Sequence, residues 1–432
     1  MAGIANAATP EPPARPPDAP AVVAPPVDAQ GRVRLDMDTA LALLRQQSPD
    51  VLAARLRARA AHGDVVTARL LPNPVFSAEV GNFAVGTTRY PHGLSAGDTV
   101  VSQFGLAEEI PMWGKRGARI ETATGRAAQA EAERDDLDRQ LAFQVRAQFT
   151  ALLAADARVR LAREAADRYA DTVRVSRERA RNGEIAPAEL DRIELEQRNF
   201  EHEVADAELD RRDAVAGLLP LVGVDAADVA PVGDLAVPDA PEDVDRLARE
   251  ALDRRPDLRA ASFAAAAADS ALRQARAEAW PDPTVGLAYT HSEFTVSGDL
   301  PNSIGGTLSV PLPVLDRNQG AIERAEAEAL AARHDVDKLK LAIPQEVRSA
   351  VVGYTTARGR VRRFADAFLR QARDTRTAAE TSYREGATSL LELLESERAF
   401  LQTQRDHLDA LKDAATAAWD ITRAAALEVT PP

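Results

Sequence analysis

The chain has 432 residues, a formal net charge of −14 and no cysteine. The acidic balance excludes a basic surface for nucleic acid, and the absence of cysteine excludes disulfides and thiolate catalysis. No run approaches ~18 consecutive apolar residues, so no transmembrane helix is expected. Aromatic residues make up only 4% of the chain, which favours close packing of helices over a bulky core.

The first 34 residues are expected to be an extended linker. Ala5-Asn6-Ala7 fits the small-residue cleavage pattern of a secretory signal, but the apolar segment that should precede it is missing. An ordinary small-residue tail fits this segment equally well. Eight prolines between Pro10 and Pro26 predict an unfolded, extended conformation.

The rest of the chain contains one plan twice. Pro49-Asp50 recurs 207 residues later as Pro256-Asp257, and Pro72-Asn73-Pro74 recurs 209 residues later as Pro281-Asp282-Pro283. This period is too long for the common solenoids and indicates a duplicated supersecondary unit. We expect repeats over residues 35–220 and 244–426, joined by a linker at 221–243 and followed by a tail at 427–432.

Each repeat is predicted to begin with a helix and two strands. In the first repeat a helix is expected over residues 39–70, ended by Pro72. The apolar period then changes to two, which predicts strands over 75–85 and 100–110, joined by a loop containing Pro91, Gly93 and Gly97. In the second repeat residues 284–289 alternate likewise, and the cleanest alternation runs over 303–312. There the apolar face carries Ile304, Leu308, Val310 and Leu312.

A very long helix follows each pair of strands. No proline intervenes between residues 115 and 181, and at 1.5 Å per residue such a helix would reach about 100 Å. That length exceeds any compact domain of this size, so we expect an elongated rod or tube. In the second repeat Pro344 is expected to bend the rod, at a cost of about 3 kcal/mol.

Both rods are predicted to end in matching turns. Gly183 and Gly386 lie where a helix C-cap needs a positive φ. Pro187 then suits the first position of a new helix, and Ser389 with Glu392 has the spacing of a capping box. Each repeat therefore ends in a helical hairpin, expected at the end of the rod opposite to the strands.

Four strands with one apolar face cannot close alone, because an open sheet in lipid leaves its edge hydrogen bonds unpaired. Three copies would supply twelve strands, enough for a transmembrane barrel with a wet lumen. A soluble antiparallel sheet packed on helices is the alternative. In the barrel the residues expected to face lipid are Phe76, Val80, Phe104, Leu106, Val285, Leu287, Ile304 and Leu308.

These features resemble the TolC family of outer-membrane efflux channels, in the segments 308–322 and 383–395 most specifically. The resemblance covers nearly everything after about residue 35. It implies a membrane α+β fold, in which a trimeric twelve-stranded β-barrel in the outer membrane continues into a long-helix periplasmic tunnel. An inner-membrane pump of the RND type would feed the duct through a periplasmic adaptor. The turn residues expected to contact that adaptor are Asn182, Gly183, Glu385 and Gly386.

The segment from Glu109 to Arg119 is similar to the Gly-Lys-Arg signature of the CzcC-type subgroup. That resemblance implies export of heavy-metal cations, typically cobalt, zinc and cadmium. A duct for drugs or organic compounds is the alternative, since a duct does not need to recognise what its pump delivers. Lys115, Arg116 and Arg119 lie where strand becomes helix, which fits contact with anionic headgroups at the periplasmic rim or a solvated turn.

The resemblance also places Glu392 and Glu395 near the closed tip of the tunnel. Threefold symmetry would make six carboxylates around one axis, which would attract cations. Alternatively, Glu392 only caps the helix that starts at Ser389. Tyr383 and Glu189 match a pair that holds the closed state of the family by a hydrogen bond between hairpins, although a tyrosine at a helix end also fits plain packing.

No catalytic chemistry is predicted from the remaining residues. The six histidines are scattered with no i, i+4 pair, so neither zinc nor copper ligation is indicated. Gly305-Gly306 lacks the lysine and the helix of a phosphate loop. We therefore expect no metal site, no cofactor and no enzyme. A soluble coiled-coil scaffold would explain the long helices, but strands at equivalent places in both repeats argue against it.

Overall fold

The computed structural model describes residues 27–29, 31–83, 85, 96–293, 300–364 and 366–427. Most of the proline-rich extension, the loop residues Pro91 and Gly93, and the tail after residue 427 lie outside the described residues. The chain forms two compact units. Unit 1 contains Met1–Leu52, Asp138–Asp243 and Ser349–Pro432, and unit 2 contains Ala53–Leu137 and Val244–Arg348. Each unit therefore draws on both predicted repeats.

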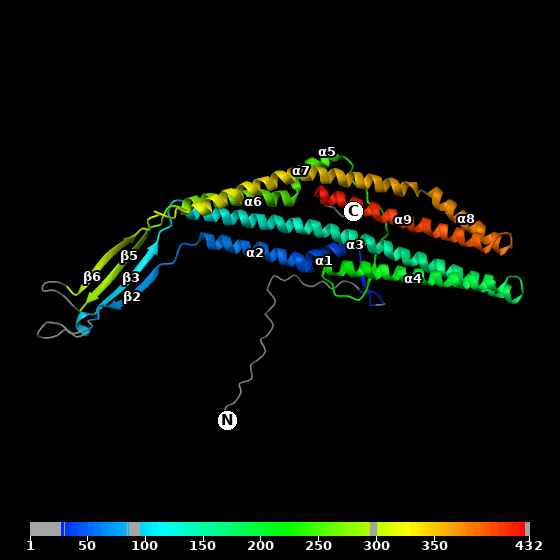
Figure 1. The fold of residues 1–432 in the computed structure, drawn as a ribbon, viewed down its shortest axis with the longest axis horizontal. Coiled ribbons are helices and arrows are strands. Elements are labelled where there is room, and N and C mark those ends of the chain that lie inside the picture. The colour runs from blue at the N-terminus through cyan, green and yellow to red at the C-terminus, as the bar shows by residue number, and fades with distance from the viewer. Residues whose placement is uncertain are drawn as a thin grey trace, which may run out of the picture. The chain divides into compact units, whose positions relative to one another are not determined.

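Unit 2 holds a four-stranded antiparallel sheet, which Figure 1 shows with its strands side by side. The order is β2 (Val75–Gly81), β3 (Val101–Glu109), β5 (Thr284–Ser292) and β6 (Asn302–Ser309). The structure confirms two strands from each repeat. The predicted strand over 303–312 was too long, because β6 ends before Pro311 and Pro313, and a proline has no N–H to donate to the sheet.

The predicted helix over residues 39–70 is two helices. α1 (Met37–Gln47) belongs to unit 1, and α2 (Pro49–Arg69) follows after Ser48 alone. Pro49 disfavours helical geometry in the residue before it, and Ser48 has an extended ψ of 124°. Pro49 marked the repeat in the sequence, but the same proline also ends one helix and begins the next.

The first long helix has the predicted bounds. α3 (Lys115–Arg181) runs for 67 residues without interruption. In the second repeat α7 (Gln319–Arg363) remains helical through Pro344, so the proline that was expected to bend the rod does not end the helix. A proline removes only one hydrogen bond of the helix, and Ile343 and Val347, which flank it, are fully buried and hold this stretch in the core of unit 2.

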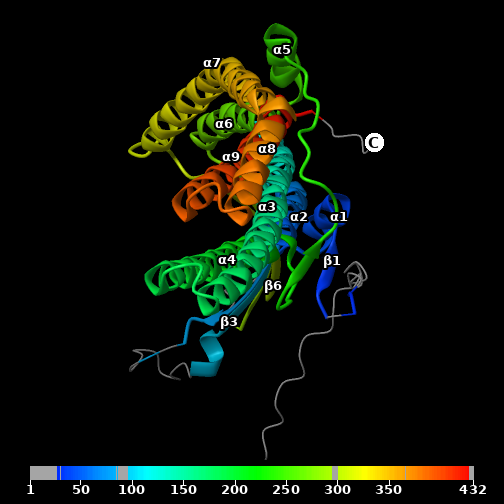
Figure 2. The same cartoon turned by 90° about the vertical axis from the view of Figure 1, so that its right-hand side faces the viewer.

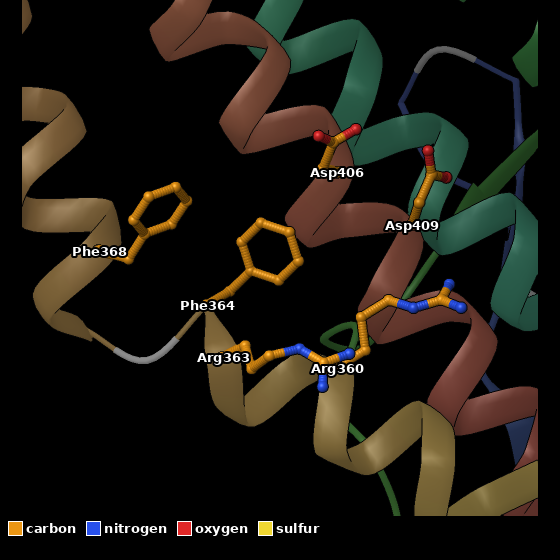
Figure 3. Close-up of a pocket in the computed structure, with 6 residues that line it drawn as sticks. All are labelled: Arg360, Arg363, Phe364, Phe368, Asp406 and Asp409. Atoms are coloured by element: carbon orange, nitrogen blue, oxygen red, sulfur yellow. The ribbon is translucent and has the colours of Figure 1, made fainter.

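The second rod is interrupted instead at Phe364. α8 (Asp366–Arg384) begins two residues later and continues to the second hairpin turn. Figure 3 shows Phe364 and Phe368 on either side of this break, with their ring centroids 6.0 Å apart. Nothing in the sequence pattern indicates this position, because no glycine or proline lies there.

Unit 1 is completed by α4 (Pro187–Val222), α9 (Leu390–Ala424) and a small parallel sheet of β1 (Val33–Leu35) and β4 (Val229–Pro231). These two strands were not predicted, because a strand of three residues is too short to show an alternating apolar pattern. α4 ends at Gly223 with φ +67°, where a Cβ would lie 2.4 Å from the carbonyl oxygen of Gln47. Only glycine fits this close approach of α4 to the end of α1.

Two further helices, α5 (Val244–Arg254) and α6 (Pro256–Glu278), belong to unit 2, and a short 3-10 helix (Ala96–Thr99) precedes β3. In the described part of the chain, no helix combines the length and the apolar character needed to cross a membrane.

Candidate functional site

Both helical hairpins turn through the same hydrogen-bonding motif. Gly183 and Gly386 have φ values of 76° and 75°. The N–H of Glu184 donates to the carbonyl of Arg179 over 2.8 Å, and Ala387 makes the equivalent bond in the second turn. This is a Schellman motif, as the glycines predicted. All four turn residues assigned to adaptor contact are exposed, namely Asn182, Gly183, Glu385 and Gly386.

The helix starts after the turns also follow the sequence. Pro187 is the first residue of α4, and the Ser389 hydroxyl accepts a hydrogen bond of 3.3 Å from the backbone N–H of Glu392. This cap uses the backbone of Glu392 and leaves its carboxylate exposed. Glu395 is exposed and Glu189 is half-buried. Capping and an acidic ring are therefore compatible roles for Glu392.

Behind the turns the two hairpins share one apolar core. In Figure 2, α8 and α9 run side by side, and residues from α3, α4, α8 and α9 are buried together. The core contains Ala165, Tyr169, Val173, Ile193, Phe200, Tyr383, Leu390, Leu393, Leu394, Phe400 and Leu401. The rings of Tyr169 and Phe200 pack with their centroids 4.9 Å apart. Side chains of both repeats thus form a single four-helix packing unit.

A buried carboxylate lies in this core. The Glu397 side chain is only 9% exposed and binds Arg168 Nη2 at 3.2 Å and Arg376 Nη1 at 3.6 Å. Both guanidinium groups also lie over the Phe400 ring, at 6.0 Å and 5.2 Å from its centroid. Because Arg168 belongs to α3 and Arg376 to α8, Glu397 ties α9 to both neighbouring helices.

Glu196 makes the matching connection from the first hairpin. Its side chain is 10% exposed and its Oε1 accepts from Arg398 Nη2 at 2.7 Å, which joins α4 to α9. Asn199 Nδ2 donates to the other oxygen at 3.0 Å. The sequence analysis missed both glutamates. The sequence did hold a signal, because both glutamates lie on an apolar stripe of their helix. Glu196 follows Ile193 by three residues, and Glu397 precedes Phe400 by three. An ionised group in such a place needs partners.

The predicted tip pair of Tyr383 and Glu189 is not formed within this chain. The Tyr383 hydroxyl is buried and has no hydrogen-bond partner, and its ring lies under the Arg179 guanidinium, 5.7 Å from the centroid. The Tyr169 hydroxyl also lacks a partner, and burial raises the pKa of that phenol. The hydroxyl groups of Tyr169 and Tyr383 can thus each still form a hydrogen bond.

A second set of contacts ties strand to helix in unit 2. Lys115, the first residue of α3, forms an ion pair of 2.8 Å with Asp282, and the two side chains are only 16% and 10% exposed. The other oxygen of Asp282 accepts from the backbone N–H of Met112 at 2.9 Å. Asp282 comes from the Pro-Asp-Pro motif of the second repeat, so this contact joins the two repeats where β3 of the first has ended and β5 of the second is about to begin.

The neighbouring arginines cap α2. Arg116 Nη2 donates to the carbonyl of Arg69 at 2.8 Å, and Arg119 Nη2 donates to the carbonyl of Leu70 at 2.8 Å. Carbonyls at a helix C-terminus lack intrahelical partners, so these bonds satisfy them. Lys115, Arg116 and Arg119 therefore have partners inside the chain. Their contact with headgroups or with solvent stays a prediction.

The register of the sheet places the eight predicted apolar residues on one face. Leu106 lies opposite Phe76 on one side and Leu287 on the other, and directly opposed residues of antiparallel strands share a face. This rule, together with the alternation of side chains along each strand, places five more residues on the same face, namely Val80, Phe104, Val285, Ile304 and Leu308. All eight are at least 45% exposed. The opposite face is mainly small and polar, with Ser77, Gly105, Thr290 and Thr307.

A hollow of about 470 Å³ lies beside the break between α7 and α8. Figure 3 shows Arg360 and Phe364 facing Asp406 and Asp409 of α9 across it. Arg360 forms an ion pair of 3.1 Å with Asp413, and Asp406 accepts from Gln402 at 2.7 Å. These partners hold the charged lining in place, and we assign no ligand to the hollow.

The chain belongs to a family defined by this architecture. The family model described as outer membrane efflux protein matches residues 40–224 and 247–426. The chain is thus an outer-membrane efflux protein and not an enzyme, as its resemblance to the TolC family predicted.

Individual relatives agree with this assignment. The chain is 26% identical over 396 residues to the cobalt-zinc-cadmium resistance protein CzcC of Cupriavidus metallidurans, covering 90% of this chain and 89% of the relative. Among solved structures it is similar to CusC, with a TM-score of 0.74 and 16% identity over 90% of this chain and 91% of that one. The CmeC outer membrane channel of Campylobacter jejuni gives a TM-score of 0.74 at 17% identity, covering 90% and 85%. At such identities these structures establish the fold alone.

Removal of the Glu397 carboxylate should destabilise the hairpins. In Glu397→Ala, Arg168 and Arg376 lose their shared partner in a largely buried place, which should lower the free energy of unfolding by about 3 kcal/mol. Glu395→Ala, on the exposed side of the same helix, is the matched control and should change it by less than about 0.5 kcal/mol. Thermal unfolding of the detergent-solubilised protein followed by circular dichroism measures both, and equal midpoints would show that the ion cluster does not stabilise the fold.

Proposed function

We propose that three copies of this chain form a passive export duct through the outer membrane. The observation that carries this proposal is the open four-stranded sheet, with β2 and β6 as its edges and one exposed apolar face. In lipid, backbone groups along an edge must find partners. Pairing β6 of one copy with β2 of the next satisfies both edges, and three copies give a twelve-stranded barrel whose small polar face lines the lumen.

Heavy-metal cations are the proposed cargo. The relative whose name specifies cobalt, zinc and cadmium matches nine-tenths of this chain. The pyoverdine export outer membrane protein OpmQ of Pseudomonas putida is 32% identical, but over only 36% of the chain. The longer match favours cations over an organic cargo. The pump that delivers them would be of the RND type.

The hairpin turns are the proposed contact with a periplasmic adaptor. Asn182, Gly183, Glu385 and Gly386 are exposed, and their backbone is fixed by the Schellman bonds. A rigid, repeated turn offers the same surface in both repeats. In a trimer this would present six similar tips to the adaptor.

The carboxylates of Glu392 and Glu395 are proposed to ring the entrance of the duct. Both lie on the first turns of α9 and are exposed in the single chain. Three copies would bring six carboxylates near one axis, where a narrow pore concentrates their field and favours cations. Tyr383 and Glu189 are proposed to pair between hairpins in the closed state, for which the unpartnered Tyr383 hydroxyl leaves capacity.

The two faces of β6 should respond oppositely to a charge. Leu308 lies opposite Val285 on the apolar face, and its neighbour Thr307 lies opposite Gly286 on the small polar face. Leu308→Arg should destabilise the barrel by about 2–4 kcal/mol, while Thr307→Arg should assemble and alter conductance. Outer-membrane fractionation and single-channel recording measure these outcomes. Equal tolerance of the two arginines would show that the lipid and lumen faces are misassigned.

Neutralising the entrance should reduce cation preference. Glu395→Ala should lower cation selectivity and weaken block by multivalent cations added from the periplasmic side, whereas Glu395→Asp keeps the charge and should retain both. The effect should shrink with salt, because the Debye length falls from about 10 Å at 0.1 M to about 3 Å at 1 M. Recordings in planar bilayers test this. Unchanged selectivity in a folded Glu392→Ala/Glu395→Ala double variant would limit these residues to stabilising the start of α9.

A further inference from the structure

A cavity of about 550 Å³ lies in unit 1, lined by α3, α4 and the segments that lead into β1 and β4. One face of each helix contributes to it. On α3 the lining residues lie at positions i, i+3, i+4 and i+7 counted from Asp156, and on α4 the same spacings begin at Glu208. Cavities of roughly 300–1,000 Å³ hold small organic ligands. The size of this one therefore suits a small molecule.

The pairing of β1 with β4 supplies the third wall. Val33 lies opposite Val229 in this parallel pair, and the Val33 N–H donates to the carbonyl of Asp228 over 3.1 Å. The residues that precede the two strands, Arg32 and Asp228, both line the cavity. Segments that are far apart in the sequence thus surround one space.

The cavity lining is positively charged in an acidic chain. Five arginines contribute to it, namely Arg32, Arg160, Arg163, Arg211 and Arg212, against three carboxylates. This leaves an excess of two positive charges, whereas the whole chain carries a net charge of −14. A dianion would balance the excess, and phosphate oxygens match the planar fork of an arginine side chain.

One of the five arginines is part of the protein frame. The Arg211 side chain is only 13% exposed. Its Nε donates to Asp156 at 3.0 Å, its Nη1 to Asp228 at 2.9 Å and its Nη2 to the carbonyl of Val229 at 2.6 Å. These bonds tie α4 to α3 and to β4. Arg211 therefore holds the walls together and is not counted among the ligand contacts.

The arginines on the exposed side are held less firmly. Arg163 pairs with Glu208 at 2.6 Å, yet its side chain is 60% exposed. Arg160 pairs with Asp156 of its own helix and is 65% exposed. Arg212 is exposed and forms no hydrogen bond or ion pair with another described residue. Because exposed ion pairs contribute little stability, these guanidinium groups can turn to an incoming anion while the fold is retained.

Apolar side chains complete the lining. Val159 of α3 and Val215 of α4 are buried beside the arginines, and Leu219 follows one turn later on α4. An inorganic ion would leave this surface in contact with water, whereas an organic group attached to the anion would cover it. The lining thus fits a ligand with a doubly charged head and a small apolar body.

We propose that this cavity binds an organic phosphate monoester, whose phosphate contacts Arg163 and Arg212 and whose apolar body lies against Val159 and Val215. A phosphate monoester carries about −1.5 to −2 charges at pH 7, which matches the excess of the lining, and a monocarboxylate does not. The bound ligand bridges α3 and α4 and stabilises unit 1. The site is separate from the proposed barrel and entrance, because neither the sheet nor the hairpin turns contribute to it.

Isothermal titration calorimetry of the full chain in mild detergent tests the site, with phenyl phosphate as the probe. Phenyl phosphate should bind more tightly than inorganic phosphate, which lacks the apolar body, and more tightly than benzoate, which carries one charge. Benzyl alcohol, with a similar body and no charge, should not bind. The affinity should fall as sodium chloride is raised, because ions screen the charged contacts.

Three variants assign the contacts. Arg212→Gln should weaken the binding of phenyl phosphate by about tenfold, because one charge-assisted contact is lost. Arg198→Gln removes an exposed arginine of α4 outside the cavity and should leave the affinity unchanged. Glu208→Gln should strengthen binding several-fold, because the carboxylate that competes with the ligand for Arg163 is gone. A purely structural role of Glu208 would not produce this gain.

A soluble phosphate and a lipid headgroup share this chemistry. Short-chain phosphatidic acid, a lipid phosphate monoester, is titrated in parallel below its micellar concentration. Tighter binding of the lipid would support the site with a headgroup as its source, and tighter binding of phenyl phosphate would support it with a soluble one.

Three results would overturn the proposal. The first is no binding of phenyl phosphate at millimolar concentration and low salt. The second is equal affinity of the natural chain and Arg212→Gln, and the third is benzyl alcohol binding as tightly as phenyl phosphate. Each would leave the proposed duct intact, because the number of chains in the assembly and the conductance do not depend on this cavity.

Discussion

The unpaired backbone groups along β2 and β6 are the constraint on which the rest of the structure depends. A sheet with two open edges and an exposed apolar face is unstable both in water, where the face is exposed, and in lipid, where the edges are unsatisfied. Closure with further copies removes both problems at once. The internal repeat contributes to this solution, because each repeat supplies two strands and the sheet pairs β3 of the first with β5 of the second.

The same joining of repeats recurs along the chain. In unit 2 the ion pair of Lys115 and Asp282 fixes the start of α3 to the strand entry of the other repeat. In unit 1 Glu196 and Glu397 connect α4 and α9, and α9 with α3 and α8, inside a shared apolar core. A buried ion pair adds little net stability compared with apolar residues of the same volume. Loss of one partner, however, leaves a buried charge without compensation, so such pairs favour one specific arrangement of the helices. A duct wall made of long helices needs such fixed registers between neighbours.

Features set by local chemistry could be predicted from the sequence. The bounds of α3, the presence of two strands in each repeat and the C-caps at Gly183 and Gly386 follow from the apolar period and from the conformations open to glycine and proline. The effect of a proline depended on its surroundings. Pro49 divides a helix that was predicted to be continuous. α7 instead continues through Pro344, where the buried side chains of Ile343 and Val347 offset one lost hydrogen bond. Contacts between distant segments, such as that of Glu397 with Arg168, could not be predicted from the sequence. The one indication of such a contact was a charged residue within an apolar stripe.

The number of chains in the assembly tests the central claim most directly. Native mass spectrometry of the protein extracted in mild detergent, with strand content followed by circular dichroism, measures it. The account predicts a complex of three chain masses that retains its strands, because four strands per chain leave edges that only neighbouring copies can pair. A monodisperse monomer with the same strand content would contradict it.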